Sequence, residues 1–243
     1  MRADFSAVMR HSRRVRPRFA RSLPATAATA LVALAALVVL AAPAAGAEKI
    51  RNHFDSDSMM RPPGFFDLVI LGAPRAASQA KWLVLVDNNP PSAPNKLAQV
   101  NTQRPEDSIA AALRRNVSFQ DGTVSTFVKK GAAREGLVLR MRDEKNFLVL
   151  LVDASGEVVL SAYVNGKATE LGRGRKDLVR PWEEYSVKAE GPQLTVSFND
   201  EKLFEARDPH PIAGRTGLAT SGPGEASFDE FIIDPVAPAG SAQ

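Results

Sequence analysis

Residues 136–166 read GLVLRMRDEKNFLVLLVDASGEVVLSAYVNG, three apolar runs separated by short polar turns. Turn-forming residues stand at Asp153, Gly156 and the Asn165-Gly166 pair, so the runs are typical of strands joined by hairpins. The middle run, NFLVLLV at residues 146–152, is apolar at both odd and even positions. That pattern predicts a strand in the centre of a sheet that is covered on both sides.

The same pattern continues outward on both sides of this stretch. Runs rich in Val, Leu, Phe and Thr recur from residues 81–87 to residues 226–234, roughly every ten residues, with Gly, Pro, Asn and Asp between them. This spacing predicts an all-β domain, a two-sheet antiparallel jelly-roll sandwich, over residues 48–235. Residues 87–108 contain four prolines and predict a long ordered loop with a short strand near 97–100.

Side-chain alternation assigns residues to the two faces of each strand. In the run at 136–142, one face is expected to carry Leu137, Leu139 and Met141, and the other Val138, Arg140 and Arg142. In the last run, one face is expected to carry Phe228, Glu230 and Ile232, and the other Asp229, Phe231 and Ile233. The adjacent acids Asp229 and Glu230 should therefore not act together on one bond.

Residues 1–47 have the composition of an export signal. They combine seven arginines with an apolar stretch at 25–42 and three small residues, Ala-Gly-Ala, at 45–47. This pattern predicts cleavage by a signal peptidase after Ala47. The pair Arg13-Arg14 leaves twin-arginine export open beside ordinary secretion. An uncleaved anchor helix is the alternative, and it would be the chain's only membrane contact. We expect a periplasmic or extracellular protein, with a frayed tail at 236–243.

Charge and cysteine content restrict the function further. Removing seven of the 31 basic and one of the 27 acidic residues with the leader leaves 24 and 26, a net charge of about −2. The mature chain thus gives no argument for a nucleic-acid partner. The absence of cysteine excludes disulfides, thiol catalysis and thiolate metal sites.

Several segments resemble exported bacterial concanavalin A-like domains, laminin-G-like jelly rolls similar to the 3-keto-disaccharide hydrolase-like group. The segments are WEEYSVKAEG at 182–191, VSFN at 196–199, GRTGLAT at 214–220 and FDEF at 228–231. Arg140 and Asn146 match positions that relatives of this group carry. The resemblance implies two antiparallel sheets with the first strand, about 49–54, beside the last, and carbohydrate as the ligand class.

Sugar sites combine an aromatic side chain with planar polar groups. Tyr163 shares its predicted face with Val159 and Ser161. If that face is concave, we expect Arg140, Arg142 and Tyr163, with Asn146, to line a shallow groove. If it is a convex outer face, the arginines are solvated.

Catalytic and metal-binding candidates are few. The Glu-x-Asp-x-x-Glu spacing of retaining glucanases does not occur. His210, with Asp208, could present an imidazole from a rigid turn, or could be an ordinary surface histidine. Asp55, Asp57 and Asp229 could converge on a calcium ion if the first and last strands are neighbours, or could be ordinary strand-end acids.

Three functions remain open from the sequence. The first is an exported domain that binds carbohydrate or another extracytoplasmic ligand without cofactor or catalysis. The second is a glycoside hydrolase similar to 3-keto-disaccharide hydrolases. The third is a structural envelope protein. A groove lined by arginine and tyrosine would favour binding, and carboxylates converging with His210 would favour catalysis.

Overall fold

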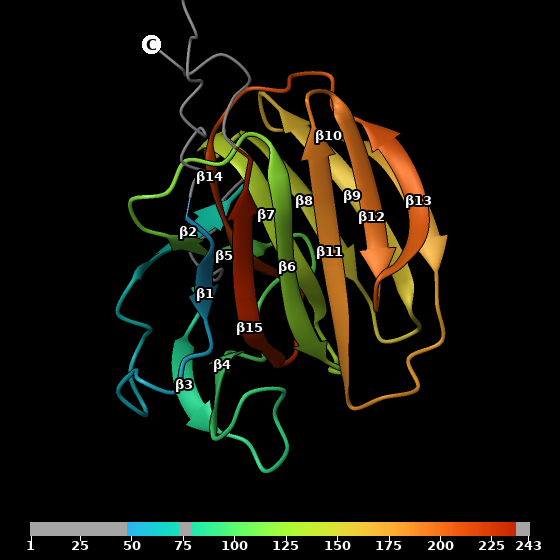
Figure 1. The fold of residues 1–243 in the computed structure, drawn as a ribbon. Helices are drawn as coiled ribbons and strands as arrows, with labels where there is room; N and C mark the ends of the chain where they lie inside the picture. The colour runs from blue at the N-terminus through green and yellow to red at the C-terminus, as the bar shows by residue number, and fades with distance from the viewer. Residues whose placement is uncertain (1–47, 73–78, 237–243) are drawn as a thin grey trace, which may run out of the picture. The chain divides into compact units, whose positions relative to one another are not determined.

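In the computed structural model of the chain, residues 48–72 and 79–236 are described, and they form two antiparallel sheets packed face to face (Figure 1). The predicted leader and most of the tail lie outside these residues. Within the described residues, no helix is long and apolar enough to cross a membrane.

The first sheet has eight strands and lies in front in Figure 1. Its path is β13 (Glu201–Arg207), β12 (Gln193–Phe198), β11 (Trp182–Glu190), β6 (Gly122–Lys129), β15 (Ala226–Pro235), β4 (Asn95–Gln99) and β3 (Trp82–Val86). β1 (Ile50–Asn52) also pairs with β15, so the first strand lies beside the last, as the resemblance implies. β4 lies within the segment 87–108, where a short strand was expected.

The second sheet has seven strands. Its order is β10 (Lys167–Arg175), β9 (Glu157–Val164), β8 (Asn146–Val152), β7 (Arg134–Asp143), β14 (Arg215–Ser221), β5 (Ile109–Arg114) and β2 (Phe66–Leu71). The two sheets confirm the predicted all-β, two-sheet antiparallel sandwich. β8 lies between β7 and β9, inside the sheet as its apolar run predicts.

The main core fills the space between the sheets, and its members alternate along the strands. β8 contributes Leu148, Leu150 and Val152 to this core, while its other face carries Phe147 and Val149. These two belong to a second, smaller apolar cluster on the outer face of the seven-stranded sheet. Burial on both faces explains why the β8 sequence lacks a polar face.

A bulge in β7 reverses the expected alternation at Arg140. Pairing with β8 shifts register between Leu139 and Asp143, and Arg140 has a positive φ of 48°. Leu139 lies in the main core as predicted, but Met141 lies in the outer cluster with Val138. The prediction that Met141 shares the face of Leu139 is therefore wrong. The extra residue in the bulge shifts the in-and-out alternation of the side chains by one position.

A second bulge lies in β15 at Glu230, whose φ is 50°. Pairing with β6 shifts register between Asp229 and Ile232. As a result, Phe228, Phe231 and Ile233 all lie in the main core. The prediction that Phe228 and Phe231 face opposite sides is wrong for the same reason as in β7.

Candidate functional site

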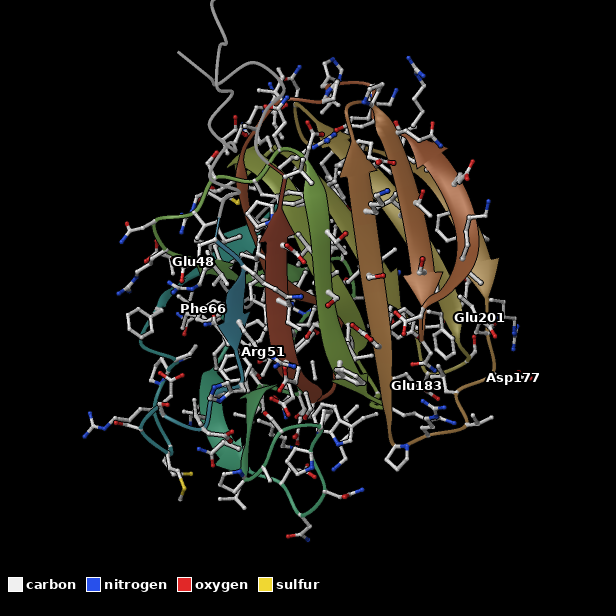
Figure 2. All side chains as sticks on the ribbon, viewed as in Figure 1. Glu48, Arg51, Phe66, Asp177, Glu183 and Glu201 are labelled. Atoms are coloured by element: carbon white, nitrogen blue, oxygen red, sulfur yellow. The ribbon has the colours of Figure 1, made fainter. Side chains whose placement is uncertain are left out.

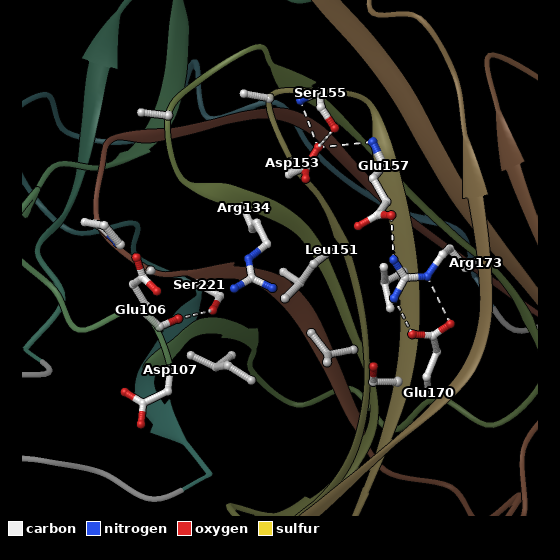
Figure 3. A pocket seen from close by; sticks show the side chains of 18 of the residues that line it. Glu106, Asp107, Arg134, Leu151, Asp153, Ser155, Glu157, Glu170, Arg173 and Ser221 are labelled. Carbon is white, nitrogen blue, oxygen red and sulfur yellow. Dashed lines mark hydrogen bonds and ion pairs between the residues drawn. The ribbon is translucent and has the colours of Figure 1, made fainter.

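A groove of about 820 Å³ lies on the outer face of the seven-stranded sheet (Figure 3). Its floor is formed by β7, β8, β9 and β10, and its ends by the loops that follow β4, β6, β8 and β14. The lining residues are Glu106, Asp107, Ile109, Ala132, Arg134, Val149, Leu151, Asp153, Ala154, Ser155, Glu157, Val159, Ser161, Tyr163, Glu170, Arg173, Ser221, Gly222 and Pro223.

The floor combines an apolar strip with polar groups. Val149 and Leu151 come from the outer face of β8, and Val159, Ser161 and Tyr163 come from the same face of β9. These side chains alternate with residues that point into the main core. Tyr163 thus lies in the groove, on the face that it was expected to share with Val159 and Ser161.

Tyr163 is held as a flat platform. Its ring stacks on Phe147 with centroids 4.4 Å apart and planes 10° from parallel. Burial raises the pKa of the Tyr163 hydroxyl, so it stays protonated and can donate a hydrogen bond at neutral pH.

One end of the groove holds a carboxylate–arginine–carboxylate group. Arg173 donates from Nε and Nη2 to Glu170 at 3.1 and 2.6 Å, and from Nη1 to Glu157 (Figure 3). The hydrogen bonds from Arg173 lower the pKa of Glu170. Glu170 is therefore an ionised acceptor at neutral pH and not a general acid.

Arg134 enters the groove from β7, between Glu106 and Ser221 on one side and Leu151 on the other (Figure 3). Its side chain is exposed, and no hydrogen bond or ion pair joins it to another of the described residues. Its guanidinium donors are thus available to a ligand in the groove.

The wall opposite β10 consists of two loops tied together. Ser221 Oγ donates to the Glu106 carbonyl at 3.2 Å, and the Gly222 amide donates to the Ser108 carbonyl at 3.2 Å. These bonds join the loop between β4 and β5 to the turn between β14 and β15. The wall therefore has a defined position relative to the floor.

Arg140 does not line the large groove, but it borders a separate small depression together with Tyr163. The β7 bulge directs its guanidinium to groups that precede β6 and follow β11 and β13. It donates to the Gln120 carbonyl at 2.9 and 2.6 Å, to the Gly191 carbonyl at 2.8 Å and to Asp208 at 2.7 Å. Because these internal acceptors use its donors, Arg140 tethers the end of one sheet to the other.

This depression, of about 20 Å³, is lined by the four residues that were expected to line a shallow groove, Arg140, Arg142, Asn146 and Tyr163. Arg142 is exposed there. Asn146 closes the turn between β7 and β8, because its amide donates to Asp143 and its oxygen accepts from the Asn165 amide at 3.0 Å.

Asp208 and His210 also border this depression, and the hydrogen bond between them comes from the backbone of His210. His210 is exposed, and its backbone amide, not its imidazole, donates to Asp208 at 2.8 Å. The other Asp208 oxygen accepts from Arg140. The buried carboxylate of Asp208 is thus held for structure, through Arg140 and the turn.

The three predicted calcium ligands do not converge in the described part of the chain. No group of three acidic or histidine side chains with metal-binding geometry occurs there. Asp229 is fully buried and accepts from the amide and hydroxyl of Ser92, at 2.7 and 2.9 Å. Asp55 accepts from the Asn95 amide, and Asp57 from the Gly64 amide, both at 3.0 Å.

Glu230, the neighbour of Asp229, has a separate partner. Its Oε2 accepts at 2.5 Å from Nε of Arg51, a residue of β1 that is labelled in Figure 2. The two adjacent carboxylates therefore bind different parts of the chain, Asp229 the loop at Ser92 and Glu230 the strand β1.

Sequence reasoning missed most of the groove's charged residues. Glu170 and Arg173 lie on β10, whose sequence KATELGRGR has no apolar alternation. Arg134 is followed by Glu135 and Gly136, and nothing in this local sequence indicates that a strand begins here or that Arg134 lies beside a groove.

No protein-family model matches the chain, and no curated protein matches it. Among solved structures, it is similar to the carbohydrate-binding module CBM66 from Bacillus subtilis, at 19% identity and a TM-score of 0.50, over 63% of this chain and 91% of that one. LamAcat from Zobellia galactanivorans is 10% identical, with a TM-score of 0.49, over 76% and 96% of the two chains. The first of these likenesses, with the strand order described above, shows that the chain has the concanavalin A-like jelly-roll fold.

Proposed function

We propose that this protein binds a neutral glycan in the groove on its seven-stranded sheet, without cleaving it. The observation that carries the proposal is an open groove of about 820 Å³ that places Tyr163 and an unengaged Arg134 over one apolar floor. A groove of this volume can accept a short oligosaccharide segment.

The floor has the chemistry that sugars require. Sugar C–H faces can pack on Tyr163 and on the strip formed by Val149 and Leu151. Arg134 and the hydroxyl of Ser161 can bind sugar hydroxyl groups at the same time. The stacked Phe147 holds Tyr163 in place, so little ordering accompanies binding.

The charge around the groove favours a neutral ligand over an acidic one. Five carboxylates line it, against two guanidinium groups. The acids are Glu106, Asp107, Asp153, Glu157 and Glu170, and the bases are Arg134 and Arg173. A uronic acid or sulfated sugar would meet a net negative surface.

The same groups argue against hydrolysis. A retaining glycosidase needs two carboxyl groups about 5 to 5.5 Å apart, one of them protonated. Glu157 and Glu170 both accept from Arg173, and the pKa of Glu170 is lowered. The strand at the centre of the floor, β8, contributes only Val149 and Leu151.

The proposed ligand set retains two of the residues expected from the sequence, Tyr163 in the groove and Arg142 beside it. Arg134 and Ser161 join them, in place of Arg140 and Asn146, whose polar atoms bind within the protein. The existence of a carbohydrate-binding module with this fold supports the assignment. We further propose that the protein acts outside the cytoplasm, since residues 1–47 have an export-signal composition.

The test is a glycan array followed by calorimetry of the full chain with the neutral oligosaccharides that score. Tyr163→Ala and Arg134→Ala should each weaken binding by about tenfold or more, equivalent to about 1.4 kcal/mol. Tyr163→Phe keeps the stacked ring and should lose less. Lys188→Ala, on the exposed face of the other sheet, is the matched control and should bind as the parent does.

Three outcomes would overturn the proposal. Binding to no glycan would favour a structural envelope role. Release of new reducing ends from the scoring oligosaccharides would favour a glycoside hydrolase. Binding that survives both alanine substitutions would place the ligand elsewhere on the protein.

A further inference from the structure

Glu170 is a carboxylate of the groove that the proposed ligand set leaves without a role. It lies on β10 and lines the groove, and its side chain is 44% exposed. Arg173, from the same strand, bonds to Glu170 and to Glu157 of β9. A ligand in the groove therefore meets hydrogen-bond acceptors on the side that β10 forms.

Strand pairing fixes where Glu170 lies relative to the aromatic platform. Ser161 pairs with Val149 on one side and with Glu170 on the other, so these residues form one row across β8, β9 and β10. Tyr163 pairs with Ala168, two residues before Glu170, so Tyr163 and Glu170 are diagonal neighbours. Diagonal neighbours in a sheet lie about 7–8 Å apart. A sugar ring that packs on Tyr163 therefore turns one of its edges toward Glu170.

Contacts with the other sheet hold β10 in place although it is an edge strand. Gly172 and Gly174 pack against β13. A Cβ atom at Gly172 would lie 2.8 Å from the ring of Phe204, and one at Gly174 would lie 2.5 Å from Leu203. The absence of side chains at these two positions permits the close approach. The backbone that carries Glu170 thus has a defined position beside the groove.

Arg173 fixes the orientation and the charge of the Glu170 carboxylate. Its Nε and Nη2 bond to one carboxylate oxygen each, at 3.1 and 2.6 Å, which sets the plane of the carboxylate (Figure 3). These bonds lower the pKa of Glu170, so it is ionised at neutral pH. A carboxylate can accept about four hydrogen bonds, and Arg173 supplies two of them. The remaining positions can accept hydrogen from a ligand.

We propose that Glu170 determines specificity by accepting a hydrogen bond from a free hydroxyl group of the sugar unit beside Tyr163. The inference rests on the proposed function and narrows its ligand class to neutral glycans that are unsubstituted on the edge facing β10. An O-acetyl or O-methyl group there removes the hydrogen that Glu170 accepts and brings an acceptor oxygen toward an ionised carboxylate. Glycans substituted at that position are therefore rejected.

The first experiment measures calorimetric binding of the full chain to four neutral trisaccharides: cellotriose, laminaritriose, xylotriose and mannotriose. Glu170→Ala should weaken the binding of each trisaccharide that the parent chain binds by about tenfold. The variant should fold, because Glu170 is exposed. Glu190→Ala is the matched control, since Glu190 is an exposed, ion-paired glutamate of the other sheet, and it should bind as the parent does.

A hydroxyl scan then tests direct contact. Each hydroxyl of a bound trisaccharide is replaced in turn by hydrogen or by O-methyl. At least one monodeoxy derivative should bind the parent chain about tenfold more weakly, yet bind Glu170→Ala as well as the unmodified trisaccharide does. An indirect, structural effect of the substitution would weaken all derivatives alike. Glu170→Gln keeps an acceptor oxygen and should lose less affinity than Glu170→Ala.

The outcomes separate this inference from the proposed function. Parent-like binding by Glu170→Ala, or a scan in which every hydroxyl keeps its effect in that variant, would overturn the role of Glu170 and leave glycan binding in the groove intact. Failure of the parent chain to bind any of the four trisaccharides or any glycan of the array would overturn both.

Discussion

Replacing Arg140 with methionine should cost the protein much of its stability. The change removes a guanidinium whose side chain is 2% exposed and leaves the carboxylate of Asp208, 3% exposed, without its ion-pair partner. Removing one member of a buried pair typically costs about 3–5 kcal/mol, because the remaining charge stays buried. The carbonyls of Gln120 and Gly191 lose their donor as well.

The assay is urea unfolding at pH 7, followed by tryptophan fluorescence. We expect the unfolding free energy of Arg140→Met to fall by about 3–5 kcal/mol, a loss that would lower the thermal midpoint by roughly 10 °C. Arg142→Met is the matched control. Its side chain is exposed, so its stability should change by less than about 0.5 kcal/mol.

A double-mutant cycle separates the pair from other effects. Asp208→Asn in the Arg140→Met background should cost less than it does in the parent chain, with a coupling energy above about 1 kcal/mol. A loss below about 1 kcal/mol in Arg140→Met would refute the structural role assigned to Arg140. It would also restore this residue as a candidate for ligand binding.

Three further predictions concern a glycine, a buried acid and metal. Gly217→Ala should destabilise the protein by about 1–3 kcal/mol in urea unfolding, because its Cβ would lie 2.0 Å from the Ala112 carbonyl oxygen; parent-like stability would show that the strands separate easily. Burial raises the pKa of Asp229 from 3.8 to about 6, so the folded state favours the protonated carboxyl. The free energy of unfolding should therefore fall by about 3 kcal/mol as the pH rises from 3.8 through 6. Asp229→Asn should flatten that part of the pH profile. Chelator should leave the melting temperature unchanged, because Asp55, Asp57 and Asp229 have separate partners; a clear fall on chelation would revive the calcium site.

Strands with a clear apolar pattern could be predicted from the sequence. β12 alternates apolar and polar residues, and β8 is apolar throughout because both of its faces are buried. β5 and β10 were missed for opposite reasons. β5 reads IAAALR, where alanine gives little strand signal, and β10 reads KATELGRGR, an edge strand that buries too little to need apolar residues.

The two bulges limited what could be predicted about side-chain direction. Arg140 and Glu230 adopt positive φ without being glycine, asparagine or aspartate, so no local residue type marks them. Tyr163 was assigned to the correct face because no bulge precedes it in β9, where pairing with β8 is regular. The sheet face to which the Arg140 side chain points could not be predicted from the alternation of apolar residues, because it depends on a register shift that is set by tertiary contacts.

The pairing of β15 has a consequence for how the protein is made. Along one edge, β15 pairs with β4 through Phe228 and with β1 through Phe231, and along the other it pairs with β6. A chain synthesised only as far as residue 225 therefore has no strand to join β1, β3 and β4 to the rest of this sheet. Stable folding of the sheet must wait until the last strand has been synthesised.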